Sequence, residues 1–391
     1  MLDSYGRVLR RPGAFAFSSA ALVARLPISM VGLGIVLLVE DRTGSYGLAG
    51  TVSAVFVLAE AAFAVLHGRW VDHFGQSRVL PIAISLFGAG LALMMLAVEQ
   101  GWPGAWTYVF AALAGASLPQ VGASVRTRWS HLLDDSREKQ TAFALEAVLD
   151  EVVFVVGPVL VTLLATSWHP VAGLTFALVT GVTGTFAFAL QRRTEPPAGR
   201  TSPSRARAPM PWRLVLTLAL VCLTLGALFG AAEVTTVAFA EEQGRRWVAG
   251  WLLAAWSFGS LVAGLVTGAI AWRSGPEARL RWGSAAMALA MVPLPFIGSV
   301  PVMAVVLLVG GLSIAPTLIG TMTMVEQGVP SSRLTEGMAI LHTGLVAGVA
   351  PGATVAGFVV DHGGASAAYV VALAGGVLAA LVAQTARPAR R

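Results

Sequence analysis

The sequence is poor in charge, and this shortage decides the class of protein. Of its 391 residues only 12% are charged and 56% are hydrophobic, with a mean hydropathy of +0.76. Soluble domains carry about 25% charged residues, so this composition excludes an ordinary water-soluble fold. The apolar runs are continuous rather than alternating, which favours membrane-spanning helices over a barrel of transmembrane strands.

Cysteine and the common catalytic motifs are also lacking. The single cysteine, Cys222, lies in an apolar run, which excludes a disulfide framework and a thiolate metal cluster. The sequence has no zinc-ligand spacing, no GxxxxGK[ST] phosphate loop and no nucleophile elbow. We therefore expect no enzyme, no metal and no cofactor, and any transport has to draw on an ion gradient or on the gradient of the solute.

Apolar runs of about 20 residues, enough to cross the hydrocarbon layer, recur along the chain. The first six expected spans are 14–39, 47–67, 80–98, 104–125, 141–166 and 170–190. The second six are 213–240, 247–271, 282–299, 301–324, 335–360 and 365–384. The first run is too long for a signal-peptide core, so we expect it to be a helix. The sequence predicts an all-α membrane protein with an N-terminal bundle (1–190), a proline-rich linker (191–212) and a C-terminal bundle (213–391).

Basic residues predict the orientation. With the N-terminus in the cytoplasm, the outer loops carry only Arg42, Arg245 and Arg246, and Arg25 lies within a span. Basic residues concentrate in cytoplasmic loops, so we expect both termini in the cytoplasm, in a bacterial inner membrane. The net charge of +6 then reports topology rather than nucleic-acid binding. We expect a monomer surrounded by lipid.

A glycine-containing loop follows the second span. It reads GRWVDHFGQSR, with Gly68, Asp72, Gly75 and Arg78. The glycines permit a tight turn. We expect Asp72 to cap the next helix, and Arg78 to hold a carboxylate or the C-terminal end of a helix.

The corresponding loop of the second half repeats this spacing. It contains Gly268, Arg273 and Gly275, with Trp272 in place of the aspartate. The pattern, GxxxDxxGxR in outline, resembles the signature cytoplasmic loop of the major facilitator superfamily, whose halves are parallel repeats. The resemblance implies 12 transmembrane helices in two pseudo-symmetric six-helix bundles, and secondary transport by alternating access.

Helix five carries a second resemblance. Its Gly157-Pro158 pair is similar to the end of a motif found in proton-driven exporters of this superfamily, although the upstream glycines of that motif are missing. The resemblance implies proton-coupled export. Helix four shows no embedded arginine of the kind many such exporters carry, because Arg126 falls near the cytoplasmic end of the expected span.

Helix eleven carries a stripe of small residues. Gly344, Gly348 and Gly352 are spaced by four, which lets helices approach closely. The resemblance places this stripe, like Gly157 and Pro158, at the interface between the two halves. Plain helix packing is the alternative.

Three carboxylates on helix five are candidates for proton coupling. Glu146 and Asp150 share one helical face, whereas Glu151 points away from it. Two neighbouring carboxylates in a low-dielectric site repel each other, which suits a proton carrier. The alternative is structural, with Glu146 solvated near the helix end and the other two paired with Arg25 or Arg126.

Ionisable residues within spans are expensive and mark functional sites. Arg25 either faces a substrate cavity or forms an ion pair with a helix-five carboxylate. Glu60 either faces the cavity or pairs with an arginine of the signature loop. Glu233 is a candidate for selecting a cationic or hydrogen-bonding substrate. His342 is either a cavity residue or, more simply, a packed neutral imidazole.

These residues predict a transporter that exchanges a small molecule, a drug or a metabolite, for protons. One alternative is a proton symporter or facilitator for a sugar or another metabolite. An alternative of another class is a membrane receptor or scaffold that does not transport.

Overall fold

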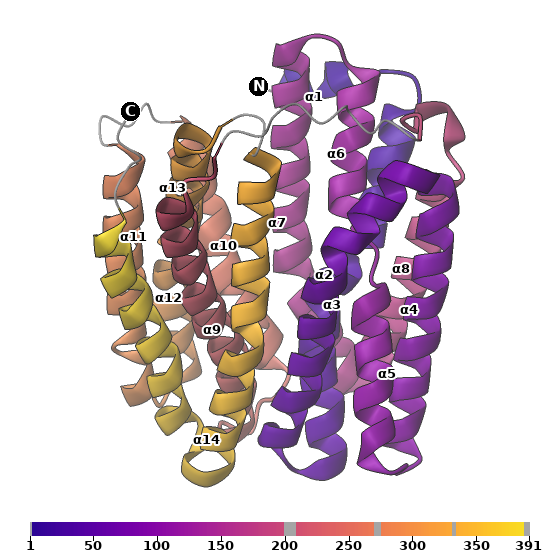
Figure 1. Ribbon diagram of the computed structural model, residues 1–391. Coiled ribbons are helices and arrows are strands. Elements are labelled where there is room, and N and C mark those ends of the chain that lie inside the picture. Colours follow the sequence, from indigo (N-terminus) through magenta and orange to yellow (C-terminus); the bar gives the residue numbers. More distant parts are fainter. Residues whose placement is uncertain (1, 199–208, 270–274, 331–333, 387–391) are drawn as a thin grey trace. The chain divides into compact units, whose positions relative to one another are not determined.

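The computed structural model describes residues 2–198, 209–269, 275–330 and 334–386, and in these ranges every regular element is a helix (Figure 1). The chain divides into two compact units. The first consists of Met1–Gly34 and Ala59–Ser202, and the second of Ile35–Leu58 and Pro203–Arg391. Residues 35–58, which contain the end of one long helix and the start of the next, thus belong with the second unit.

The first half of the chain is built from long apolar helices joined by short turns. Its elements are α1 (Leu2–Leu9), α2 (Ala14–Thr43), α3 (Tyr46–Phe74), α4 (Gln76–Glu99), α5 (Gly104–Ser117), α6 (Val121–Leu132), α7 (Ser136–Ser167), α8 (Ala172–Ala189) and the 3-10 turn η1 (Arg192–Thr194). The short helix α1 precedes the first expected span and was not predicted from the sequence.

The second half repeats this pattern. Its elements are α9 (Trp212–Glu242), α10 (Val248–Ala269), α11 (Pro276–Met291), η2 (Leu294–Phe296), α12 (Val300–Gly311), α13 (Ile314–Gly328) and α14 (Leu334–Thr385). Helix α14 has 52 residues and bends at Gly364, where φ is 74°. A straight helix of that length would reach about 78 Å, more than twice the hydrocarbon thickness, so α14 supplies two spans.

Ten segments of the described residues are long and apolar enough to cross a membrane. The bend in α14 divides one of them into two. Helix α11, with 16 residues, is slightly shorter than the others and stands where the ninth span is expected. The structure therefore agrees with twelve spanning segments in an all-α membrane protein.

The fourth span of each half is interrupted. Helix α5 ends at Ser117 because Pro119 lacks an N–H group and restricts Leu118 to an extended conformation, and α6 begins at Val121. In the second half α12 ends at Gly311 and α13 begins at Ile314. The sequence predicted each of these as one unbroken span. In membrane transporters, short or interrupted spans at corresponding positions of two repeats point to the binding site.

Residues 35–58 belong with the second unit because α14 holds the start of α3. Asp361 accepts hydrogen bonds from the backbone N–H groups of Tyr46 and Gly47 at 2.7 and 2.8 Å. These donors lie in the first turn of α3, where N–H groups have no partner within the helix. The backbones also approach closely, since a Cβ atom on Gly357 would lie 2.3 Å from the carbonyl oxygen of Tyr46.

The glycine stripe of α14 packs against α9 in the same unit. A Cβ atom on Gly348 would lie 1.9 Å from the carbonyl oxygen of Leu223, and one on Gly352 would lie 2.0 Å from that of Ala227. Gly344 faces the carbonyl oxygen of Ala219 in the same way. The stripe therefore serves helix packing within one half.

We expect Gly348→Val to destabilise the second unit by about 1–3 kcal/mol, because the obstacle is backbone and cannot rotate away. The measurement is the thermal unfolding temperature of the purified protein in detergent. Gly298→Ala is the matched control, since a Cβ atom there meets no other atom within 4 Å. Equal unfolding temperatures for Gly348→Val and the control would contradict this packing.

Candidate functional site

A buried arginine forms the centre of the first unit's polar network. Arg25 of α2 is 1% exposed. Its Nη2 atom lies 2.5 Å from Glu146 and its Nη1 atom 2.6 Å from Asp150, while its Nε–H donates to the carbonyl oxygen of Ala21 at 3.0 Å. Of the two roles expected for Arg25, the geometry shows the ion pair with carboxylates of α7.

Glu146 is completely buried. Besides Arg25, it accepts hydrogen bonds from Ser18 Oγ at 2.7 Å and from Trp129 Nε1 at 2.8 Å. Trp129 is itself held by an edge-to-face contact with Phe17, with ring centroids 4.6 Å apart. The alternative in which Glu146 is solvated near the end of its helix is therefore wrong, because α6 and α2 cover this part of α7.

Asp150 joins two arginines. Its second oxygen lies 2.6 Å from Arg126 Nη2, and its side chain is 30% exposed. Arg126 was expected at the end of the fourth span, but α6 continues to Leu132 and brings Arg126 into the network. The network therefore contains two guanidinium groups and two carboxylates, so its formal charges balance, and Asp150 is its more accessible carboxylate.

Glu151 lies outside this network, as its position on α7 predicts. Its side chain is partly exposed, and within the described residues it makes no ion pair. Gly157 of the same helix packs against Ser29 and Met30 of α2, and Pro158 lies inside α7 without ending it.

Glu60 and His67 of α3 flank the interruption of the fourth span. Glu60 forms a side-chain hydrogen bond with Gln120, so the expected pairing with a loop arginine is not seen among the described residues. His67 is buried, and its Nδ1 atom lies 3.2 Å from the carbonyl oxygen of Leu118. His67 is not among the residues predicted from the sequence, because it stands at the last position of the expected span 47–67. A histidine seven residues after Glu60, on the same helical face, was the available signal.

The remaining two candidates lie in the second unit. Glu233 of α9 is partly exposed. His342 of α14 is exposed, so the packed imidazole expected from the sequence is wrong.

The signature loop is folded differently from the expectation. Asp72 is exposed and lies in the last turns of α3, because that helix continues to Phe74. The α4 helix begins after Gly75, which has a φ of 92°. The carboxylate that binds its first turn belongs to Glu195, which accepts the N–H of Ser77 at 2.8 Å. Glu195, rather than Asp72, thus serves the N-terminus of α4.

The start of the expected linker is therefore bound to the first unit. Arg128 of α6 is fully buried and donates from Nη1 to the carbonyl oxygen of Gln191 at 3.0 Å. Its guanidinium also lies 3.8 Å from the ring centroid of Phe188, a cation–π geometry. Arg78 of the signature loop is exposed.

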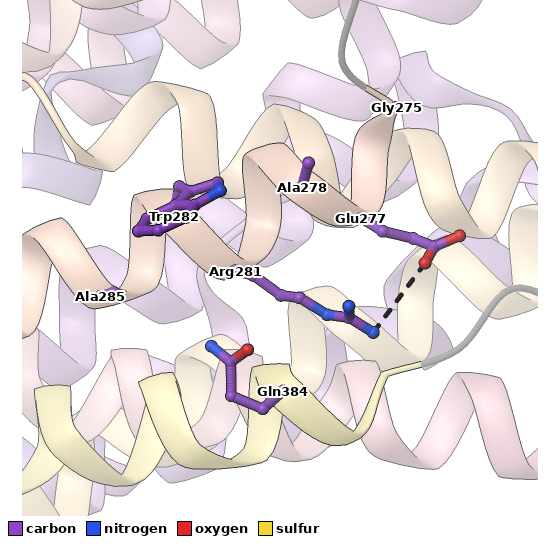
Figure 2. Close-up of a pocket in the computed structure, with 7 residues that line it drawn as sticks. All are labelled: Gly275, Glu277, Ala278, Arg281, Trp282, Ala285 and Gln384. Atoms are coloured by element: carbon purple, nitrogen blue, oxygen red, sulfur yellow. Dashed lines mark ion pairs between the residues drawn. The ribbon is translucent and has the colours of Figure 1, made fainter.

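The second copy of the loop borders a hollow. Gly268 lies in the last turn of α10, Arg273 is outside the described residues, and Gly275 directly precedes α11 as Gly75 precedes α4. The hollow has a volume of about 660 Å³ and lies between α11 and the end of α14 (Figure 2).

Figure 2 shows Arg281 beside Gln384, with a dashed line to Glu277, 3.9 Å away. Trp282 on the rim is 78% exposed, which suits a tryptophan at a membrane–water boundary. None of the embedded candidates lines this hollow. We therefore assign it no part in substrate binding.

Known proteins resemble this chain in sequence. The profile of the family described as Major Facilitator Superfamily matches residues 17–297 and 242–391. The chain is 27% identical over 326 residues to the multidrug efflux pump Tap of Mycobacterium tuberculosis, covering 78% of this chain and 77% of the relative. The same values hold for Tap of Mycobacterium bovis.

Solved structures share the fold. The xylose transporter XylE of E. coli, in its inward open conformation, has a TM-score of 0.69 at 13% identity, covering 96% of this chain and 97% of that one. A bacterial homolog of the human lysosomal transporter Spinster gives 0.71 at 12% identity, with 97% and 96% covered. The human organic anion transporter MFSD10 gives 0.64 at 17% identity, with 95% and 98% covered. At these identities the likeness concerns the fold alone.

Proposed function

Because the chain belongs to the major facilitator superfamily, we propose that it exports small molecules across a bacterial inner membrane in exchange for protons. Membership makes the chain a multi-pass transporter rather than an enzyme. The mycobacterial relatives named as multidrug efflux pumps support export of drug-like compounds. The positions of basic residues support cytoplasmic termini.

The shared carboxylate of Asp150 is the observation that supports proton coupling. It bridges Arg25 and Arg126 at 2.6 Å each, and it is exposed enough for a proton to arrive from an aqueous cavity. A proton on Asp150 removes the charge that holds both guanidinium groups. Of its two carboxylate partners Arg25 then keeps only Glu146, and Arg126 is released from α7.

This release biases an equilibrium between two arrangements of the helices. A proton shifts such an equilibrium only if it binds the two arrangements with different affinity, and the pairing with two arginines supplies that difference. Glu146, held by Ser18 and Trp129, keeps Arg25 in place throughout. Proton binding to Asp150 and substrate binding thereby exclude one another, so that protonation drives substrate release, as antiport requires.

Everted membrane vesicles test the proposal. Respiration makes their lumen acid, and a fluorescent acridine dye reports the gradient. We expect tetraphenylphosphonium to collapse part of the gradient only in vesicles that contain this chain. The control is vesicles from the same strain without it. An unchanged gradient for this probe and for a panel of other lipophilic drugs would contradict proton-coupled export.

A further inference from the structure

Glu233 of α9 is an embedded carboxylate for which the described residues supply no partner. In the described part of the chain it makes no ion pair and no hydrogen bond, whereas Glu146 and Asp150 are held by arginines. Its side chain is nevertheless only partly exposed. An ionisable group within a spanning helix is expensive, so an unpaired one marks a site where a ligand supplies the missing partner.

One aromatic ring shares the helical face of this carboxylate, and a second ring packs against the first. Phe229 precedes Glu233 by one helical turn and shares its face of α9. Trp256 of α10 contacts Phe229, with ring centroids 5.4 Å apart and planes at 71°. The faces of aromatic rings attract cations within about 6 Å, tryptophan most strongly. Helix α9 thus carries a carboxylate and an aromatic ring on one face, and α10 adds the tryptophan that contacts this ring.

The indole of Trp256 also has an unused donor. The residue is 6% exposed, and its Nε1–H has no acceptor among the described residues. Buried indole N–H groups usually have a hydrogen-bond partner. The nitrogen faces α12 just before the interruption of the tenth span, since a Cβ atom on Gly310 would lie 3.9 Å from it. Interrupted spans of this kind form the substrate sites of many transporters.

We propose that Glu233, Phe229 and Trp256 bind lipophilic organic cations that carry a hydrogen-bond acceptor. The carboxylate pairs with the positive centre, the rings lie against it, and Trp256 Nε1 donates to an ether or carbonyl oxygen of the ligand. This site names the substrate class and rests on the proposed function. Its binding step is nonetheless measurable without transport.

Equilibrium binding to the purified full-length protein in detergent tests the site. Berberine is a permanent cation with ether oxygens, and tetraphenylphosphonium is a permanent cation without an acceptor. We expect Glu233→Gln to weaken both by roughly tenfold or more, as expected for a lost contact to a charged group. Glu233→Asp, which keeps the charge, restores most of the affinity. Glu326→Gln, at an exposed carboxylate of α13, leaves it unchanged.

Trp256→Phe removes the indole N–H donor but keeps an aromatic ring at this position. We expect it to weaken berberine binding by roughly three- to tenfold and to change tetraphenylphosphonium binding by less than about twofold. Trp251→Phe, at an exposed position of the same helix, is the control. This selective loss tests the site even if Glu233→Gln does not fold.

The possible outcomes separate this inference from the proposed function. Cation binding that depends on Glu233, without proton exchange in vesicles, would support the site and contradict antiport. Proton exchange that is unchanged in Glu233→Gln, with unchanged affinity, would overturn the site alone. A wild-type protein that binds neither cation would overturn the site as well.

Discussion

Replacing Arg25 with methionine is expected to cost the protein about 3–5 kcal/mol of stability, because it leaves a buried carboxylate without its cation. Glu146 is completely buried and cannot gain water as a substitute. Asp150 keeps Arg126, so the loss falls on Glu146. The measurement is thermal unfolding of the purified protein in detergent, compared with wild type.

A second substitution identifies the cause. In Arg25→Met with Glu146→Gln the buried charge is gone, and the glutamine oxygen still accepts from Trp129 and Ser18. We expect this double variant to recover most of the lost stability, since removing both members of a buried pair is often nearly neutral. Arg126→Met, at an arginine that is 37% exposed, should cost less. Unfolding of Arg25→Met at the wild-type temperature would contradict the energetic role assigned to this pair.

Asp150→Asn is expected to abolish proton-driven transport while leaving substrate exchange intact. Asparagine retains an oxygen for Arg25 or Arg126 but binds no proton in this range of pH, so the link between protonation and release is lost. In proteoliposomes, uptake driven by a pH gradient should fall to the level of liposomes without protein. Counterflow, which exchanges labelled for unlabelled substrate without net proton movement, should continue.

The control for this variant is Glu151→Gln. Glu151 is the next residue of α7 but lies outside the arginine network, so its removal should leave gradient-driven uptake near the wild-type rate. If Asp150→Asn lost counterflow as well, the residue would be needed for binding or folding. If it kept gradient-driven uptake, Asp150 would not carry the proton.

Much of the fold could be predicted because membrane spans are read from local composition. A run such as 213–240 needs only hydrophobicity to predict α9. The interruptions at Leu118 and Leu312 were missed, since a proline or glycine pair within an apolar run is equally compatible with a continuous helix. The link between Asp361 and α3 was also missed, because the two segments are more than three hundred residues apart.

The site was predicted in part. Of the two alternatives that the sequence left open for Arg25, the ion pair with helix-five carboxylates is the one seen, in its contacts with Glu146 and Asp150. Sequence spacing placed Glu146 and Asp150 on one face correctly, but it could not show that Trp129 and Ser18 bury the first of them. The roles of Trp256 and Glu195 depend on long-range packing, and neither residue has a local motif that reveals it.

The most direct test of the account is uptake of labelled tetraphenylphosphonium into proteoliposomes that contain only this protein, with the membrane potential clamped by potassium and valinomycin. Antiport predicts accumulation when the lumen is acid, and none when the gradient is absent or reversed. Accumulation into an alkaline lumen would indicate symport, and equal uptake with and without a gradient would indicate a facilitator. Either result would contradict proton-coupled export.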